Sequence, residues 1–243
     1  MRMKKKKKLF TRKGLLKAND SRSQEKSLIG DKLPFSAAEA YKLLRTNLDF
    51  SVAESKRCKI YGFISALPGE GKTTTAINTA YTIGETGQHV LLIEADLRLP
   101  SISKKINVPV KPGLSNYLVG NKDLASMIFP SKIHSNLDIM PAGDLPPNPA
   151  ELLDSKGMKE LLERLSDVYD TIIIDLPPIG VVTDGLILTK MVDGMVLVVK
   201  EDYCDKKALD DTIRKLQFAD AKILGFVMNG AGSQGSKYGN YSK

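Results

Sequence analysis

Short apolar runs alternate along the chain with segments in which apolar residues recur at helical spacing. The apolar runs predict strands at residues 60–65, 89–95, 137–141, 171–175, 194–199 and 223–228, and the helical spacing predicts helices at residues 36–53, 72–84, 155–168, 183–191 and 205–218. Because most runs are apolar at successive positions, both faces of the strands are expected to be buried. The pattern predicts an α/β fold: a doubly wound, mainly parallel sheet with helices on both faces.

Both ends of the chain lack such a pattern. Residues 1–33 are polar, without apolar periodicity, and are expected to form a disordered basic arm. Residues 230–243 are rich in Gly and Ser and are expected to form a flexible tail that contains tyrosines. Residues 34–229 then form one folded domain, of a size that supports a single core.

The positive charge of the chain is concentrated in the arm. The chain has 243 residues and a formal net charge of +8, and residues 1–17 hold nine Lys or Arg and no acid. The remaining 27 basic and 28 acidic residues nearly balance, so no basic face for nucleic acid is expected on the folded domain. The arm is expected either to contact anionic lipid, at about 1 kcal/mol per Lys or Arg, or to be a solvated tail.

Nothing in the sequence predicts a membrane span or a secretory signal. No apolar run approaches the roughly 20 residues of a span, and the arm lacks the apolar segment of a signal peptide. Cys58 and Cys204 show no metal or redox spacing. These observations favour a reducing, cytoplasmic setting.

The strongest motif is a phosphate-binding loop at residues 66–73, ALPGEGKT, between a predicted strand and a predicted helix. It fits the Walker A pattern, whose glycines let backbone N–H groups face phosphate oxygens at a helix N-terminus. Lys72 is expected to reach the β- and γ-phosphates of ATP, and the Thr73 hydroxyl to bind Mg²⁺. The residues expected to bind nucleotide here are Gly69, Glu70, Gly71, Lys72, Thr73 and Thr74.

Acidic residues follow two other predicted strands. Asp175 ends the strand at 171–175 and is typical of a Walker B acid, while Glu94 and Asp96 end the strand at 89–95. Ligands of doubly wound sheets bind at this edge. Carboxylates two residues apart on an extended segment are expected to point the same way. The predicted Mg²⁺ ligands, direct or through water, are Thr73, Asp96 and Asp175.

Five stretches in this order carry a resemblance to a known family: PGEGKTTT, LLIEADLRLPS, PGLSNYL, NLDIMPAGDLPPNPAELL and YDTIIIDLPPIGVVTD. Over residues 34–230 the chain resembles the bacterial tyrosine kinases of capsular and exopolysaccharide synthesis. The wider group is the MinD/ParA-like ATPases, which carry an early P-loop lysine in the pattern KGGxGK. Leu67 stands at that position here. The resemblance therefore implies a P-loop kinase domain at residues 34–229.

The resemblance also implies catalytic roles. The family's Asp-x-Asp-x-Arg motif reads Glu94-x-Asp96-x-Arg98 here, with a first acid that is one methylene longer. Lys72, Glu94, Asp96 and Asp175 are the implied catalytic residues, and either Glu94 or Asp96 is the candidate to accept the tyrosine proton. Asn229 either contacts adenine, as in related ATPases, or is a strand-end turn residue.

Two further motifs of the family concern assembly and phosphorylation. Its Glu-x-x-Arg-x-x-Arg oligomerisation motif reads Glu39-x-x-Lys42-x-x-Arg45, which either supports a ring or forms a solvated helix face. The family's terminal tyrosine cluster is reduced to Tyr238 and Tyr241, which are implied phosphate acceptors unless their presence is chance.

Taken with the resemblance, these features predict an ATP- and Mg²⁺-dependent protein-tyrosine kinase that autophosphorylates its C-terminal tyrosines and regulates capsular or exopolysaccharide synthesis and export. The chain looks like the split form of the family, which lacks a fused transmembrane activator. Its implied partners are that activator, other copies in a ring, protein substrates of polysaccharide synthesis and a phosphotyrosine phosphatase. It is expected in the cytoplasm, peripheral at the inner face of the membrane through its partner. The alternatives are a MinD/ParA-like ATPase switch and a regulatory scaffold without kinase activity.

Overall fold

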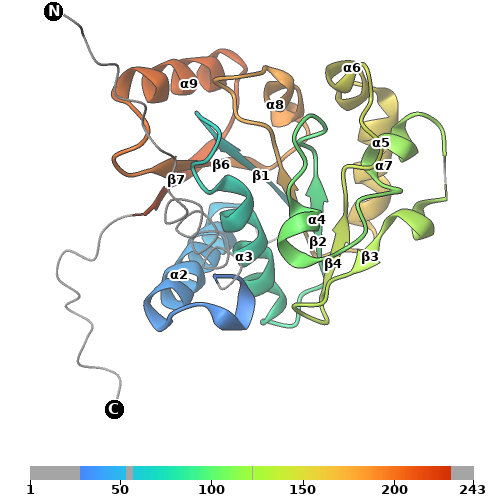
Figure 1. Ribbon diagram of the computed structural model, residues 1–243, viewed down its shortest axis with the longest axis horizontal. Helices are drawn as coiled ribbons and strands as arrows, with labels where there is room; N and C mark the ends of the chain where they lie inside the picture. Colours follow the sequence, from blue (N-terminus) through green and yellow to red (C-terminus); the bar gives the residue numbers. More distant parts are fainter. Residues whose placement is uncertain (1–27, 53–56, 122, 231–243) are drawn as a thin grey trace, which may run out of the picture.

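The centre of the molecule is a seven-stranded sheet (Figure 1) with strand order β3-β4-β2-β5-β1-β6-β7. The computed structural model describes residues 28–52, 57–121 and 123–230, so the predictions for the first 27 residues and for Tyr238 and Tyr241 lie outside the described residues. The strands are β1 (Lys59–Ser65), β2 (Val90–Glu94), β3 (Phe129–Pro130), β4 (Leu137–Met140), β5 (Thr171–Asp175), β6 (Gly194–Lys200) and β7 (Ile223–Asn229). All pairings are parallel except that of β3 with β4. The predicted fold class is confirmed.

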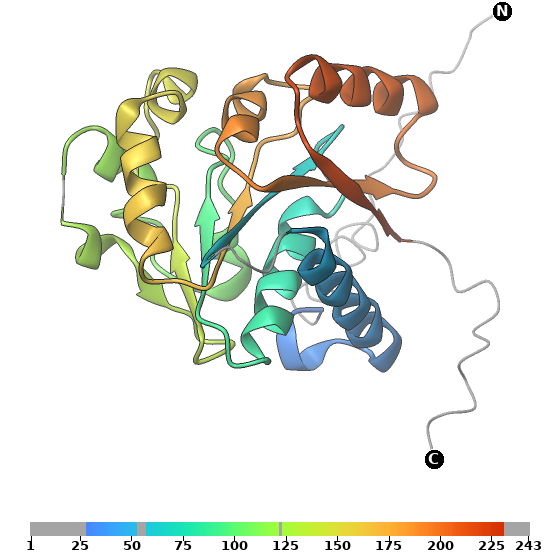
Figure 2. The same ribbon diagram turned by 180° about the vertical axis from the view of Figure 1, so that it is seen from behind.

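Helices cover both faces of the sheet, as the views from opposite sides show (Figures 1 and 2). One apolar core contains residues of α2, α3 and α4, and the other contains residues of α6, α7 and α9. The helices are α2 (Phe35–Ser51), α3 (Lys72–Gly84), α4 (Ile102–Ile106), α5 (Leu114–Leu118), α6 (Pro149–Leu153), α7 (Lys156–Ser166), α8 (Asp184–Ile187) and α9 (Lys206–Phe218). Short 3₁₀ helices lie at η1 (Gly30–Lys32), η2 (Leu124–Met127) and η3 (Leu188–Lys190).

The structure differs from the sequence predictions in its short elements. Helices α4, α5 and α6 were not predicted, because five residues are too few to show a helical repeat of apolar positions. The helix predicted at 183–191 is a four-residue α-helix followed by a 3₁₀ turn. Strand β3 was also missed, since two residues carry no alternation.

Residues 28–33 were assigned to the disordered arm, and the structure corrects this boundary. They contain η1, and Ile29 is buried in the core beside α3. The side chain of Asn78 holds the segment, accepting the N–H of Gly30 and donating to the carbonyl of Leu28, both at 3.0 Å. The folded domain therefore begins earlier than predicted.

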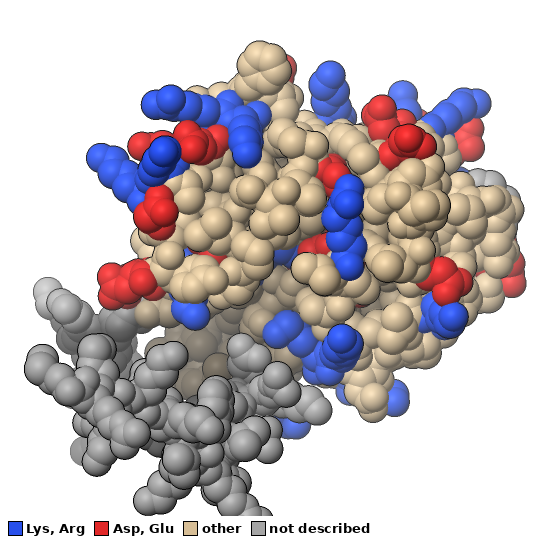
Figure 3. All heavy atoms as spheres, turned by 45° about the horizontal axis from the view of Figure 1, so that its top comes forward, with Lys and Arg blue, Asp and Glu red and all other residues tan. Residues whose placement is uncertain are grey.

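Charged side chains of both signs are interspersed over the face drawn in Figure 3. No extended region of one sign stands out among the described residues on this face. The mixture agrees with the near balance of 27 basic and 28 acidic residues outside the first 17 positions.

Helix α2 is attached to the domain by few groups. Among its residues, Leu48 alone is fully buried. The carbonyls of its last turn accept hydrogen bonds from other elements: Tyr61 donates to Leu48 at 2.9 Å, and Lys59 donates to Asp49 at 3.2 Å. Burial raises the pKa of Tyr61, so its hydroxyl stays protonated and remains a donor. The attachment depends on the buried Leu48, the partly buried Leu44, the bond from Arg45 to the Thr82 carbonyl and a capped C-terminus.

Replacing Leu48 by Ala is expected to lower the free energy of unfolding by about 2–3 kcal/mol, because a cavity forms beneath α2. Leu43 on the same helix is 62% exposed and serves as the matched control, with an expected loss below about 0.5 kcal/mol. Urea unfolding followed by circular dichroism measures both. Equal losses for the two variants would contradict the anchoring role of Leu48.

Candidate functional site

Three parallel strands bring the predicted functional residues to one edge of the sheet. Phe63 of β1 and Glu94 of β2 are both in register with Asp175 of β5. Because the chain leaves all three strands at their carboxyl ends, the P-loop and the acidic residues lie close together. The juxtaposition predicted from the sequence is present.

The P-loop connects β1 to α3 through two glycines with left-handed backbone. Gly69 has φ 85° and Gly71 has φ 89°, a region that side chains disfavour. A Cβ atom on Gly71 would also lie 1.8 Å from the side-chain nitrogen of Asn229. The left-handed backbone therefore favours glycine at position 71, and any side chain there would also displace the amide of Asn229.

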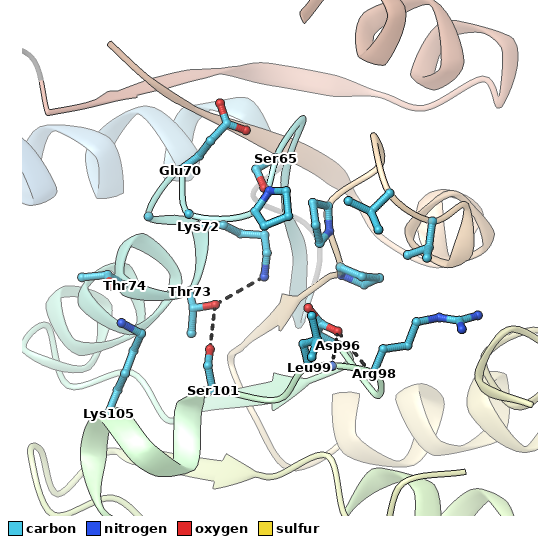
Figure 4. A pocket seen from close by; sticks show the side chains of 17 residues that line it. Ser65, Glu70, Lys72, Thr73, Thr74, Asp96, Arg98, Leu99, Ser101 and Lys105 are labelled. Carbon is cyan, nitrogen blue, oxygen red and sulfur yellow. Dashed lines mark hydrogen bonds between the residues drawn. The ribbon is translucent and has the colours of Figure 1, made fainter. Parts of the chain in front are cut away.

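The side chain of Glu70 holds the loop and does not face the cavity (Figure 4). It is 1% exposed and accepts the N–H of Leu67 at 2.6 Å and that of Lys200 at 3.4 Å. The side chain of Asn229 donates to the Glu70 carbonyl at 2.8 Å. Only the backbone of Glu70 is therefore placed to meet a phosphate, and Asn229 supports the loop from behind.

Lys72, Thr73 and Asp175 form the polar centre of the site. The Lys72 ammonium lies 2.5 Å from one oxygen of Asp175, and the Thr73 hydroxyl donates to the other at 2.7 Å. Asp175 is fully buried, and burial raises its pKa while the adjacent ammonium acts in the opposite direction. A buried carboxylate requires such partners, because an unpaired one costs several kcal/mol.

Asp96 lies in the cavity and is held by the turn that follows β2. Its Oδ1 atom accepts the N–H of Arg98 at 3.3 Å and that of Leu99 at 3.0 Å. Both bonds are on the same oxygen, so Oδ2 is placed to receive a proton or a metal ion. Asp96 is therefore a good candidate for both of its predicted roles.

The side chains of Glu94 and Asp96 were predicted to point the same way, and the structure shows that they do not. It is fully buried, is absent from the cavity lining, and accepts the N–H groups of Ser101 and Ile102 at the start of α4. Strand β2 ends at Glu94, so the alternation of an extended segment does not continue to Asp96. Burial is the main cause that raises the pKa of Glu94, to about 7. Its second oxygen has no hydrogen-bond partner.

A cavity of about 260 Å³ opens over these groups, and Figure 4 shows the side chains that line it. The end of β1 and the P-loop form one part of its lining, and residues from α4 and the loops after β2 and β5 form the rest. Ser101 reaches from the first loop to Thr73, with 3.2 Å between their hydroxyl oxygens. The lining is Ser65, Pro68, Gly69, Glu70, Gly71, Lys72, Thr73, Thr74, Asp96, Arg98, Leu99, Ser101, Lys105, Pro177, Pro178, Val181 and Val182.

An ion pair joins the two loops. Arg98 donates through Nε to Asp184 at 2.7 Å and through Nη2 at 3.2 Å, a two-pronged contact. Asp184 was not identified as a functional residue from the sequence. The available signal was its place at the end of the PIGVVTD stretch that carries the resemblance.

The predicted oligomerisation residues Glu39, Lys42 and Arg45 have different partners in the structure. Glu39 and Lys42 form an exposed ion pair at 2.8 Å. Arg45 instead donates to the carbonyl of Thr82 on α3 at 2.8 Å. Arg45 therefore fastens α2 to the domain, and the outward face near the pair carries the apolar side chains of Phe35, Leu43 and Phe50, which are 63%, 62% and 83% exposed.

The donor set fits a magnesium nucleotide. Thr73, Asp96 and Asp175 offer hard oxygen atoms, which Mg²⁺ prefers. Within the described residues no cluster of three or more His, Cys, Asp or Glu is arranged to hold a metal ion. Mg²⁺ usually binds one or two carboxylates and completes its shell with phosphates and water, so the site suits a metal that arrives with a nucleotide.

Comparisons with known proteins agree with this geometry. A family model described as an AAA domain matches residues 59–223. The chain is 38% identical over 205 residues to the tyrosine-protein kinase YwqD of Bacillus subtilis (strain 168), covering 84% of this chain and 86% of YwqD.

Solved structures place the fold in the same group. The kinase domain of the Escherichia coli tyrosine kinase ETK matches with TM-score 0.79 and 33% identity, over 89% of this chain and 84% of that chain. The septum site-determining protein MinD from Pyrococcus horikoshii OT3, solved with Mg-ADP, matches with TM-score 0.61 and 28% identity, over 72% of this chain and 71% of that chain. With this site and these relatives, the chain belongs to the bacterial tyrosine-protein kinases, on the P-loop fold that they share with MinD.

Proposed function

We propose that the chain is an ATP- and Mg²⁺-dependent protein-tyrosine kinase that phosphorylates tyrosines of its own tail and of proteins in capsular or exopolysaccharide synthesis. The observation that carries the proposal is the convergence of Lys72, Thr73, Asp96 and Asp175 on one cavity, in a member of this family. Phosphoryl transfer is catalysed chiefly by positioning and charge neutralisation, and these groups supply both.

In this proposal Lys72 exchanges Asp175 for phosphate oxygens when nucleotide binds. The 2.5 Å contact shows that the ammonium already lies where a negative charge is stabilised. Asp175 and the Thr73 hydroxyl would then hold Mg²⁺, which would neutralise charge on the phosphates. The phenol oxygen then bonds to the γ-phosphorus, the bond to the bridging oxygen breaks, and ADP leaves.

Asp96 is the better candidate to receive the phenolic proton. Its side chain lines the cavity, whereas both N–H groups that bind Glu94 belong to the start of α4. Glu94 then acts on the site indirectly, by fixing the loop whose Ser101 hydroxyl meets Thr73. We therefore assign Glu94 a supporting role.

The second candidate function is an ATPase switch of the MinD type. The likeness to MinD favours it, but the P-loop lysine of partitioning ATPases is replaced by Leu67. A regulatory scaffold that uses ATP only for assembly is the third. Incubation with ATP followed by detection of phosphotyrosine separates the kinase from both.

We further propose that copies assemble through α2 and that a transmembrane protein activates the chain at the inner face of the membrane. The exposed apolar side chains of α2 support self-association, since such patches favour contact with a partner. None of the described helices is long and apolar enough to cross a membrane. A phosphotyrosine phosphatase would reverse the modification.

Lys72→Met is expected to lower phosphotyrosine formation at least a hundredfold, because the variant loses the ammonium that neutralises the phosphates. An assay with purified protein, ATP and Mg²⁺ measures it, and Lys156→Met, which alters an exposed lysine of α7 outside the cavity lining, is the control. Near-normal phosphotyrosine in Lys72→Met would refute the site.

Glu94→Gln is expected to retain phosphoryl transfer and to change the pH dependence of stability. With a pKa of about 7 in the folded state, Glu94 binds its proton more tightly than in the unfolded chain. Folding stability is therefore lost as the pH rises from about 4.5 to about 7, by at most on the order of 3 kcal/mol.

The Gln variant lacks this titration, so it should gain stability relative to the wild type as the pH rises through that window. Urea unfolding at pH 5 and pH 8, with EDTA present, measures the difference. A difference that is the same at both pH values, or loss of kinase activity as large as that of Asp96→Asn, would contradict the supporting role.

The tail tyrosines are expected to carry most of the phosphate after incubation with ATP. Replacing Tyr238 and Tyr241 by Phe should remove at least about nine tenths of it, as measured by mass spectrometry, while phosphorylation of an added peptide continues. Phosphate confined to Tyr41, Tyr61 or Tyr169 would show that the tail is not the acceptor.

A further inference from the structure

One side of the nucleotide cavity is built from aliphatic side chains that the phosphate chemistry does not use. They come from the turn after β2 and the loop after β5: Leu99, Pro177, Pro178, Val181 and Val182. We call this group the apolar slot. It shares the cavity with Lys72 and Asp96, so an apolar surface runs directly into the catalytic groups.

Three side chains of the slot are not part of the hydrophobic packing of the domain. Leu99, Val181 and Val182 belong to neither of the two apolar cores. Leu99 is 74% exposed and Val181 is 60% exposed. Exposed aliphatic side chains gathered at the rim of a polar site favour contact with an apolar part of a ligand. The phosphates and ribose of a nucleotide are polar and do not fit that surface, so adenine is the one part of a nucleotide that competes for it, and the affinity for ADP distinguishes the two occupants.

An ion pair fixes the two sides of the slot relative to one another. Arg98 directly precedes Leu99, and Asp184 follows Val182 by two positions. The guanidinium bonds both oxygens of Asp184, whose side chain is 5% exposed. The same turn also donates the N–H groups of Arg98 and Leu99 to Asp96. A side chain seated against Leu99 therefore lies beside the carboxylate that is placed to take a proton.

We propose that the apolar slot binds the aromatic ring of the acceptor tyrosine, with Leu99 and Val181 contacting the ring and Asp184 acting as a positioning residue. This rests on the proposed kinase function. A tyrosine side chain matches the slot in chemistry, because its ring is apolar and its hydroxyl needs a polar partner. A serine side chain has no ring to contact Leu99 and Val181. The slot thus favours tyrosine through apolar contact.

The transfer step in this arrangement is balanced. The phenolic oxygen forms a bond to the γ-phosphorus of ATP as the bond to the β–γ bridging oxygen breaks, and the phenolic proton passes to Asp96. The products are phosphotyrosine and ADP. The acceptor is either Tyr238 or Tyr241 of a tail or a tyrosine of another protein, since both present the same side chain.

The test uses the full chain with Tyr238→Phe and Tyr241→Phe, so that only an added tyrosine peptide accepts phosphate. Adding Leu99→Ser and Val181→Ser is expected to lower kcat/KM for the peptide at least tenfold, from loss of apolar contact. The affinity for ADP with Mg²⁺ should stay within about twofold. Val168→Ser, which changes an equally exposed valine (68%) beyond the end of α7, is the matched control and should leave both unchanged.

To learn whether the tail tyrosines use the same slot, Leu99→Ser and Val181→Ser are also made in the chain that keeps Tyr238 and Tyr241, and phosphate on the tail is measured. A parallel loss of tail phosphate shows that tail and peptide use one slot. Unchanged kcat/KM for the peptide in the Leu99→Ser/Val181→Ser variant, in a protein that otherwise phosphorylates it, overturns the slot and leaves the kinase function standing. A parent that binds ADP with Mg²⁺ but phosphorylates no tyrosine overturns both.

The Asp184→Asn variant distinguishes a role of Asp184 in positioning the slot from a role in the stability of the fold. It should raise KM for the peptide at least fivefold and KM for ATP less than twofold, because the neutral amide cannot hold the Arg98 guanidinium as an ion pair. Urea unfolding checks that the variant is folded. An equal rise in both KM values would assign Asp184 to the nucleotide and overturn its role in the slot.

Discussion

The site depends on a single buried carboxylate, Asp175 at the end of β5. A charge with no solvent access has to be paired, and the structure meets this requirement with an ammonium and a hydroxyl from the first turn of α3. That requirement holds the start of α3 against the end of the central strand. The loop after β2 is joined to the same centre through the hydroxyls of Ser101 and Thr73. The electrostatics of one side chain thus bring three loops into one cavity.

Site residues that follow from spacing within a short stretch of sequence were predictable. Contacts between residues far apart in the sequence were not. Glycine at 69 and 71, Lys72 and Asp175 follow from spacing, because a phosphate loop needs a turn and a helix N-terminus within a few residues. The inward carboxylate of Glu70 meets the backbone of residue 200, which lies 130 positions away. The partner of Arg98 is 86 positions away, and that of Gly30 is 48. The packing of strands and loops determines which of these residues meet, and sequence periodicity does not predict that packing.

The side chain of Glu94 is one methylene group longer than the Asp of its motif, and this length changes its role. The sequence suggested a longer acid in the role of the first carboxylate of its motif. In the structure the longer side chain reaches the first N–H groups of α4. Its carboxylate is buried there, and one of its oxygens lacks a hydrogen-bond partner. Its charge therefore disfavours folding above neutral pH while its hydrogen bonds order the loop. Energetic cost and geometric benefit are combined in one residue, a common property of functional sites.

The bond from Asn229 to the Glu70 carbonyl fixes where the tail begins. Gly230 follows directly, so the tail is tethered beside the phosphate loop, and Tyr238 stands eight positions further along. Eight extended residues span at most about 29 Å. The tether therefore limits the volume that the first tail tyrosine can search to a small region around the site or around that of an adjoining copy. Within that region the tyrosine is present at high effective concentration, so the proposed tail phosphorylation would depend on tether length more than on affinity for the tail sequence.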